Sequence, residues 1–280
     1  MDFDIKPASD YPLPDLVELL NRGFENYFVP IELNVSSFLA MLRKDGIDLT
    51  ASPVLLIGER PAGIALIARR GWTSRLAAMG ISQEMRGVGA GSWLMEKLIH
   101  EARQRGDCEM VLEVIEQNDP AVRLYQKYGF QAVRRLIGLT RRGKDAEEEH
   151  LDNLHEMDLR EMGRMISQYG LPDLPWQLSA ESIAQMNPPA RASCKDQAYA
   201  AISNPDAEHI VIWSLLVEPS ARGKNLGMEM LKSLIATHAG KTWHIPAIFP
   251  EGLGKVFERA GFEREELSQW QMRLVLVPTS

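Results

Sequence analysis

The chain has 280 residues, 45% hydrophobic and 25% charged, which is the composition of an ordinary folded protein and excludes a disordered or fibrous one. The formal net charge of −7 argues against a nucleic-acid partner, because nucleic-acid binding needs a basic face. Two cysteines are too few for a disulfide framework or a zinc site, and the sequence shows no signal-peptide pattern or bilayer-spanning run. We therefore expect a cytoplasmic protein without a metal or membrane contact.

The first half of the chain contains a glycine-rich loop between a strand and a helix. The apolar stretch at 75–82 predicts the strand, and apolar residues at helical spacing from Gly91 to Ala102 predict the helix, which ends at Gly106. Gly87, Gly89 and Gly91 stand at alternate positions in the loop. Bare amides at a helix N-terminus suit an anion such as a phosphate, although turn geometry alone would also explain the glycines.

A second strand and helix follow in the first half. The run EMVLEVI at 109–115 predicts the strand, and Asn118 or Asp119 caps the next helix, which Gly129 ends. The buried stripe of this helix is expected to consist of Ala121, Leu124 and Tyr128, with Tyr125 beside it.

The second half repeats this order of elements. RGVGAGSWLMEKLIHEA, which starts at Arg86, aligns without a gap with RGKNLGMEMLKSLIATHA, which starts at Arg222. Further along, LYQKYGF at 124–130 corresponds to VFERAGF at 256–262, and strands are expected at 209–217 and at 242–249.

A charged run at 140–153 separates the two copies. It has no hydrophobic period, so we place the boundary near Lys144, between a domain of residues 1–143 and one of residues 144–280. The two histidines of this region lie five positions apart and share no helix face, so a solvated linker is favoured over a metal site. The ligands considered were Glu149, His150, His155 and Glu156.

Two familiar phosphate loops fit the glycines poorly. A nucleoside-triphosphate loop ends in Gly-Lys-Ser/Thr, whereas Gly91 is followed by Ser92 and Trp93. A dinucleotide loop begins directly after its strand and has its third glycine where Ser92 stands. A nicotinamide-binding oxidoreductase stays a minor alternative, since Glu109 is at a tolerable distance for a ribose contact.

A third kind of loop fits better. The segment Arg86 to Gly91 resembles the R/Q-x-x-G-x-G/A acyl-CoA loop of the GNAT N-acetyltransferase superfamily. The segment Leu112 to Val114, then Asn118 and LYQKYGF, resemble that family's next strand and helix, and the likeness extends more weakly over 209–265. The resemblance implies an α/β (α+β) fold of two acyl-CoA N-acyltransferase-like domains, each a mixed, mostly antiparallel sheet flanked by helices.

The resemblance also implies an acetyl-CoA site without a metal. The pantetheine arm would insert beside a splayed strand and pair with its backbone, while the loop amides would hold the pyrophosphate. The implied contacts are Met79, Ile81, Arg86, Gly87, Val88, Gly89, Ala90, Gly91, Ser92 and Asn118.

Two residues are implied to act in catalysis. Glu113 takes the family's position for the general base that deprotonates the amine, with Glu116 as a second candidate. Tyr125 takes the position of the general acid that protonates the leaving thiolate. Each also has a structural explanation, Glu113 as a polar strand residue turned to solvent and Tyr125 as a packed aromatic.

The second copy lacks these groups. The corresponding pairs are Gly89 and Asn225, Glu113 and Ile245, Asn118 and Pro250, and Tyr125 and Phe257. We therefore expect one working site, in the first domain, which moves an acetyl group from acetyl-CoA to a primary amine of a small molecule or a peptide.

The identity of the acceptor stays open. The resemblance places its pocket partly on NYFVPIEL at 26–33, where Tyr27, Phe28 and Glu32 are available to line it. The main alternative is a non-catalytic acyl-CoA-binding sensor or scaffold, against which Glu113 and Tyr125 argue because a sensor needs neither. We expect a monomer, as a pseudo-dimer of domains, or a homodimer.

Overall fold

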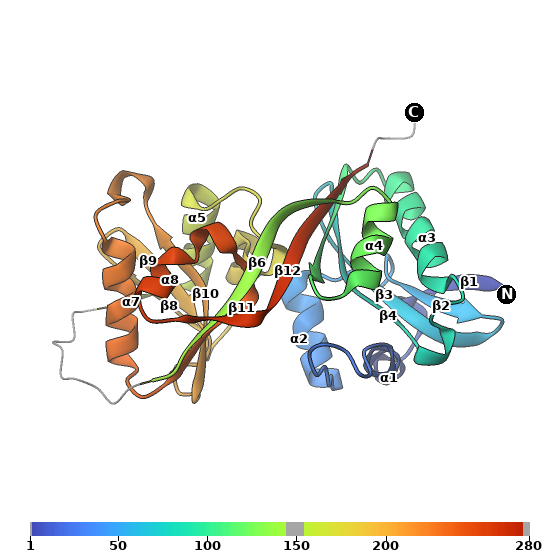
Figure 1. Cartoon of the computed structure of the whole chain (residues 1–280), viewed down its shortest axis with the longest axis horizontal. Coiled ribbons are helices and arrows are strands. Elements are labelled where there is room, and N and C mark those ends of the chain that lie inside the picture. Colours follow the sequence, from blue (N-terminus) through green and yellow to red (C-terminus); the bar gives the residue numbers. More distant parts are fainter. Residues whose placement is uncertain (1, 144–153, 277–280) are drawn as a thin grey trace. The chain divides into compact units, whose positions relative to one another are not determined.

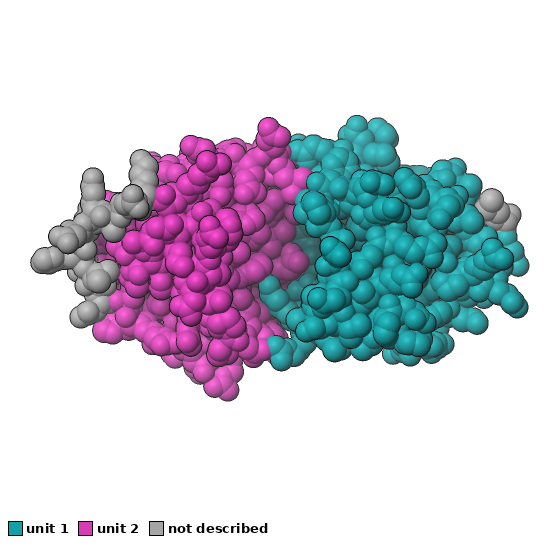
Figure 2. Space-filling view, turned by 90° about the horizontal axis from the view of Figure 1, so that it is seen from below, with its two compact units in different colours: residues 1–133, 270–280 teal, residues 134–269 magenta. Residues whose placement is uncertain are grey.

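The computed structural model describes residues 2–143 and 154–276. Two compact units are present, coloured separately in Figure 2: unit 1 comprises residues 1–133 and 270–280, and unit 2 comprises residues 134–269. Unit 1 thus includes the end of the last strand, β12 (Glu263–Val275). The predicted boundary at Lys144 lies outside the described residues, as do Glu149 and His150, and the boundary stays a prediction.

Unit 1 is built on a mixed sheet, as predicted. Its strands follow the order β1, β2, β3, β4, β5 and β12, and the first four pair antiparallel while β4 and β5 pair parallel. The strands are β1 (Phe3–Pro7), β2 (Pro53–Ile57), β3 (Arg60–Arg70), β4 (Thr73–Ile81) and β5 (Glu109–Ile115). The helices are α1 (Leu13–Gly23), α2 (Val35–Asp45), α3 (Ala90–Gln104) and α4 (Asp119–Lys127), with the 3-10 turns η1 (Ala8–Asp10) and η2 (Gln83–Met85).

Helices cover both faces of the unit 1 sheet (Figure 1), and an apolar layer lies under the helices on each face. Alternate residues of β3 enter opposite layers: Ile64 and Leu66 pack with α1 and α2, whereas Ala65 and Ile67 pack with α3 and α4. Such a run of buried residues on both faces is typical of a central strand. The second layer is completed from the far end of the sequence by Met272, Leu274 and Leu276.

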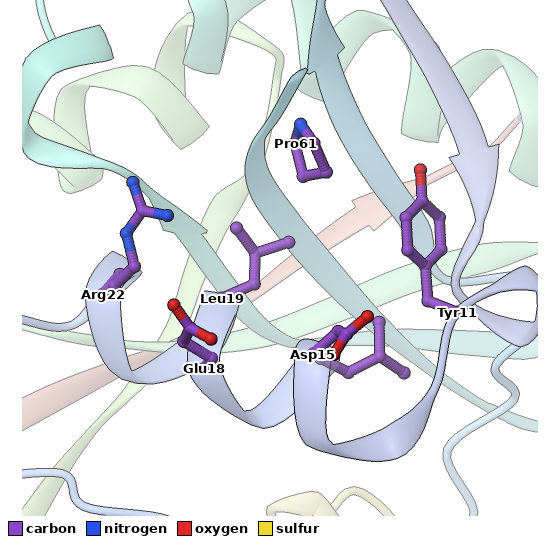
Figure 3. A pocket seen from close by; sticks show the side chains of 7 residues that line it. Tyr11, Asp15, Glu18, Leu19, Arg22 and Pro61 are labelled. Atoms are coloured by element: carbon purple, nitrogen blue, oxygen red, sulfur yellow. The ribbon is translucent and has the colours of Figure 1, made fainter. Parts of the chain in front are cut away.

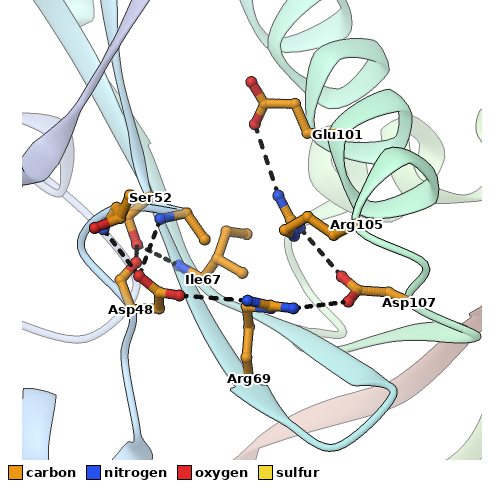
Figure 4. A network of polar contacts seen from close by, with 9 residues as sticks. Asp48, Ser52, Ile67, Arg69, Glu101, Arg105 and Asp107 are labelled. Carbon is orange, nitrogen blue, oxygen red and sulfur yellow. Dashed lines mark hydrogen bonds and ion pairs between the residues drawn. The ribbon is translucent and has the colours of Figure 1, made fainter.

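A network of ion pairs and hydrogen bonds joins the end of β3 to the residues that follow α3 (Figure 4). The buried carboxylate of Asp107 accepts hydrogen bonds from Arg69 Nη2 at 3.4 Å and from Arg105 Nη2 at 3.2 Å. Ser52 accepts a hydrogen bond from the Ile67 amide at 2.8 Å, so its hydroxyl takes the place of a strand partner. The network offsets part of the cost of burying these charges, while the Nε atoms of Arg69 and Arg105 are buried without a hydrogen-bond partner among the described residues.

Unit 2 repeats the arrangement. Its strands follow the order β6, β11, β10, β9, β8 and β7, with β10 and β11 parallel in the way that β4 and β5 are. The strands are β6 (Gln131–Arg141, which starts in unit 1), β7 (His155–Met157), β8 (Arg191–Lys195), β9 (Ala198–Ile202), β10 (His209–Val217) and β11 (Thr242–Pro250). The helices are α5 (Leu159–Tyr169), α6 (Ala180–Ala184), α7 (Leu226–Thr237) and α8 (Lys255–Arg259), with η3 (Trp176–Leu178), η4 (Pro219–Ala221) and η5 (Glu251–Leu253).

His155 and Glu156 belong to β7 and not to a linker, which corrects the sequence-based expectation. Their strand pairs with β8, and Glu156 forms an ion pair with Arg191 at 3.2 Å. Among the described residues, no three His, Cys, Asp or Glu side chains are grouped so that they could hold a metal. No helix in residues 2–143 or 154–276 is long and apolar enough to cross a bilayer.

Candidate functional site

The two central strands of unit 1 separate partway along their length. β4 and β5 pair over three residues, from Thr73 opposite Glu109 to Arg75 opposite Val111, and both strands then continue without further pairing to each other. A bulge at Ala77 accompanies the separation, since Leu66 lies opposite Ala78 and Ile67 opposite Leu76. The edge of β4 near Met79 and Ile81 is therefore not paired by β5, as the splayed strand requires.

The loop after β4 has the backbone conformation that its glycines permit. Gly87 and Gly89 have φ of 80° and 90°, in the left-handed region, and no atom lies within 4 Å of where a Cβ would stand at either residue. At Gly91 a Cβ would stand 3.5 Å from Ile81 and 3.6 Å from Leu124, which is ordinary contact. Turn geometry thus explains two of the glycines, and no atom fills the space beside them where a side chain would stand.

Arg86 holds this loop to the rest of unit 1. Its Nε donates to the Ile81 carbonyl at 3.1 Å, and its Nη2 donates to the Gly23 carbonyl at 2.9 Å. The end of α1 lies against β4 so closely that a Cβ on Gly23 would stand only 2.8 Å from the Gly80 Cα. The side chain of Arg86 therefore bridges β4 and α1, and its predicted contact with a cofactor stays a prediction.

Two residues that sequence reasoning did not place at the site reach the first turn of α3. Lys127 Nζ donates to Ser92 Oγ at 2.9 Å, and the Tyr128 hydroxyl donates to the Ser92 carbonyl at 2.6 Å. These bonds fasten the end of α4 to α3 and add a cation beside the helix N-terminus. The sequence placed Lys127 on a helix but contained no signal that it reaches Ser92.

Tyr125 is the buried residue of α4, so its predicted place beside the buried stripe is wrong, although Ala121 and Tyr128 of that stripe do pack against the core. Its ring packs against Phe130 at 5.8 Å between centroids, because the chain turns back at Gly129 with φ of 90°. Burial and the nearby Tyr27 phenol both raise the pKa of Tyr125, so the phenol keeps its proton. Both the packing role and the acid role are compatible with this position.

Asn118 joins Tyr27 to this cluster. Its Oδ1 accepts from the Ala121 amide at 3.3 Å, which confirms the predicted helix cap. Burial raises the pKa of Tyr27, and a hydrogen bond with the Asn118 side chain counteracts part of that rise. Tyr27 also meets the rings of Phe24 and Phe28 edge-on, at 5.1 and 5.5 Å. The segment predicted to line the acceptor pocket thus contacts a predicted cofactor residue.

Glu113 is buried in an ion pair and does not face solvent, which corrects its structural explanation. Arg75 Nε lies 2.7 Å from Glu113 Oε2, and Arg75 Nη1 lies 3.4 Å from Asp45 Oδ2. The Arg75 and Glu113 side chains are 5% and 4% exposed. An acceptor of the amine proton at this position would have to act while paired with a guanidinium.

Unit 2 keeps the backbone of the loop. Gly223 and Asn225 have φ of 79° and 65°, and asparagine is among the few residues that tolerate this region. Arg222 donates to the carbonyls of Val217 at 3.1 Å and Tyr169 at 2.7 Å, as Arg86 does to Ile81 and Gly23. The replacement of Gly89 by Asn225 therefore leaves the chain path intact.

A separate hollow lies between α1, Tyr11 and Pro61 at the start of β3 (Figure 3). Its volume is about 230 Å³, and none of the predicted site residues lines it. The lining residues are Tyr11, Asp15, Leu16, Glu18, Leu19, Arg22 and Pro61. It is distinct from the opening between β4 and β5.

Comparisons with known proteins agree with this architecture. Residues 13–130 match the model of the acetyltransferase (GNAT) family. No curated protein matches the chain. The family match favours acyl transfer over the nicotinamide-dependent alternative.

Solved structures extend the likeness to both units. A GCN5-related N-acetyltransferase from Sphaerobacter thermophilus is 14% identical, with TM-score 0.71, over 99% of this chain and 97% of that one. A tandem GNAT protein from the clavulanic acid biosynthesis pathway is 13% identical, with TM-score 0.65, over 100% of both chains. A putative acetyltransferase from Pyrococcus horikoshii is 17% identical, with TM-score 0.65, over 99% and 90%. Residues 13–130 thus belong to the acetyltransferase (GNAT) family, and the whole chain shares its fold with these solved structures.

Proposed function

We propose that unit 1 transfers an acetyl group from acetyl-CoA to a primary amine of a small molecule or a peptide. The observation that carries the proposal is the opening between β4 and β5, which lies directly before a loop whose two left-handed glycines have open space around them. The opening exposes a strand edge, and the loop presents unpaired amides to an anion.

The residues present fit acetyl-CoA, which supplies an acetyl thioester and a pyrophosphate. The amides from Gly87 to Ser92 would hold the pyrophosphate, with the Lys127 ammonium adding positive charge. Backbone groups of β4 near Met79 and Ile81 would pair with the amides of the pantetheine arm, as an added strand does. Asn118 would contact the arm from the start of α4.

The reaction would use one backbone group to stabilise negative charge and two side chains to move protons. A backbone N–H on the free edge of β4 stabilises the oxyanion that develops when the amine nitrogen attacks the thioester carbonyl carbon. When the carbon–sulfur bond breaks, Tyr125 would donate its phenolic proton to the thiolate; its raised pKa keeps the phenol protonated until that moment and also makes it a weaker acid than a solvent-exposed phenol. Glu113 takes the proton that the amine loses, through water, or Glu116 does so if the pair with Arg75 holds Glu113.

The amine acceptor would bind beside Tyr27. The contact of Tyr27 with Asn118 supports a pocket that includes residues 26–33, with the exposed Phe28 and Glu32 within the same segment. A cytoplasmic location and a monomeric or homodimeric state remain predictions from the sequence.

Thiol release from acetyl-CoA in the presence of a panel of amines and amino-terminal peptides tests the proposal. Gly89→Arg fills the open space of the unit 1 loop, whereas Asn225→Arg makes the matched change at the same loop position of unit 2. We expect Gly89→Arg to abolish thiol release and Asn225→Arg to preserve it. Equal loss in both variants would place the activity elsewhere.

A non-catalytic acyl-CoA sensor is the second candidate, and one observation favours it. Glu113, the residue implied as base, has a structural partner in Arg75 and so has a reason to be present without catalysis. A sensor predicts that calorimetry detects acetyl-CoA binding that Gly89→Arg removes, while no amine in the panel releases thiol.

A further inference from the structure

Unit 2 contains an apolar cavity where β10 leaves β11. Its volume is about 260 Å³, and its walls come from α5, the residues after α5, the second half of β10 and the end of β11. Arg222 is the charged residue among those that line it. The apolar side chains that matter for the argument are Tyr169, Leu171, Trp213, Leu216, Phe249 and Leu253.

The cavity arises from large side chains at positions that are small in unit 1. In unit 1 the end of α1 lies directly on Gly80, with Gly23 in close contact. The position of β10 that aligns with Gly80 is Leu216, which lines the cavity together with the end of α5, and the bulged position is Trp213 where unit 1 has Ala77. The helix end cannot approach the strand as closely, so space remains between them.

The walls of the cavity are incompletely covered. β10 pairs with β11 only as far as Val211 opposite His244, although β10 continues to Val217. Leu171 and Leu253, which line the cavity, are 40% and 44% exposed. An apolar ligand that covers this exposed apolar surface removes it from water, which favours binding.

Arg222 gives the cavity a fixed positive charge. Its Nε and Nη2 are held by the carbonyls of Val217 and Tyr169, which fix its position but do not neutralise its charge. Within the described residues, no carboxylate lies at ion-pair distance from this guanidinium. An anionic group bound here would form an ion pair with the Arg222 guanidinium.

The volume sets the size of the occupant. A cavity of about 150 Å³ holds benzene with its six carbon atoms, so one of about 260 Å³ holds about ten non-hydrogen atoms. We propose that this cavity of unit 2 binds a medium-chain carboxylate, with its alkyl chain between Trp213 and Phe249 and its carboxylate at Arg222. The proposal is independent of acetyl transfer by unit 1.

Calorimetric titration of the full chain with octanoate tests the proposal, with 1-octanol as the uncharged probe of the same chain length. We expect one octanoate site per chain and at least tenfold weaker binding of 1-octanol. Leu171→Glu with Leu253→Glu places negative charge at the exposed edge of the cavity and should weaken octanoate at least tenfold. The matched control is Leu39→Glu, at a leucine of α2 in unit 1 that is 47% exposed, and it should leave octanoate binding within twofold.

Trp213 reports whether the ligand occupies this cavity. Octanoate should change the tryptophan fluorescence of the wild type saturably, and Trp213→Phe should remove most of that change. Gly89→Arg should leave octanoate binding unchanged, because the unit 1 loop takes no part in it. Absence of octanoate binding, equal binding of 1-octanol, or equal weakening by Leu39→Glu would overturn the proposal without affecting the proposed function of unit 1.

Discussion

The buried pair of Arg75 and Glu113 is the most informative place to perturb unit 1. Glu113→Gln preserves the shape of the side chain and removes its charge, which leaves the buried guanidinium with Asp45 at 3.4 Å. Removal of one partner of a buried ion pair costs about 3–5 kcal/mol. A unit of this size loses roughly 2–4 °C of Tm per kcal/mol, so the Tm of unit 1 should fall by roughly 6–20 °C, toward the low end because glutamine still accepts a hydrogen bond.

The assay is thermal unfolding of the full chain by calorimetry and circular dichroism, for Glu113→Gln, Arg75→Gln and the double variant. Because the side chains touch at 2.7 Å, the double variant should lose about 1–3 kcal/mol less than the sum of the single losses. Strictly additive losses, or a Glu113→Gln variant as stable as the wild type, would refute the argument that the two charges depend on each other.

Turnover in the same proteins separates a structural role from proton transfer. Well below the Tm, loss of kcat in Glu113→Gln with an unchanged KM for acetyl-CoA would assign the amine proton to Glu113. Glu116→Gln is the control on the neighbouring carboxylate. If that variant alone loses kcat, the proton acceptor is Glu116 and Glu113 serves the fold.

Three further predictions concern the loop, the last strand and the phenol. Gly89→Ala should destabilise unit 1 by about 1–2 kcal/mol, because φ of 90° strains an alanine. Gly89→Asn should cost less, because asparagine tolerates this region and Asn225 adopts it in unit 2. Chemical denaturation compares the two variants, and the reverse order would contradict the conformational argument. Met272→Ala, at a residue 1% exposed, should lower the free energy of unfolding of unit 1 by about 2–5 kcal/mol and make unit 1 more susceptible to protease. Val275→Ala, at a residue 65% exposed, should change neither. Mass spectrometry of the cleavage products shows whether the cuts lie in unit 1. Tyr125 has a raised pKa, so unfolding releases its proton above about pH 10, and the wild type should lose about 1.4 kcal/mol of stability per pH unit there relative to Tyr125→Phe; equal slopes in both proteins would show that the phenol is not buried in solution.

Local patterns predicted the elements and their caps. The strands expected at 109–115 and 209–217 have those bounds, because alternation of apolar residues and the adjoining turns are encoded within a few positions. The Asn118 cap is equally local, since its oxygen bonds an amide three residues on. The two left-handed glycines of the loop follow the same rule, and so does Asn225.

Contacts between distant positions were not predictable in this way. The pairs Arg75–Glu113 and Lys127–Ser92 join residues 38 and 35 positions apart, and no period or spacing relates them. Helical spacing did not show that Tyr125, rather than Leu124, is the buried residue of α4, because the turn at Gly129 brings Phe130 back against the Tyr125 ring.

The origin of Met272, Leu274 and Leu276 affects how the chain is made. All three complete the α3-side core of unit 1, yet every residue of unit 2 precedes them in the sequence. The ribosome synthesises the chain from the N-terminus, so the core of unit 1 cannot be completed until all of unit 2 has been synthesised. During that interval the underside of α3 is open to chaperones and to premature aggregation, and a slow stretch of translation near residue 270 would prolong the exposure.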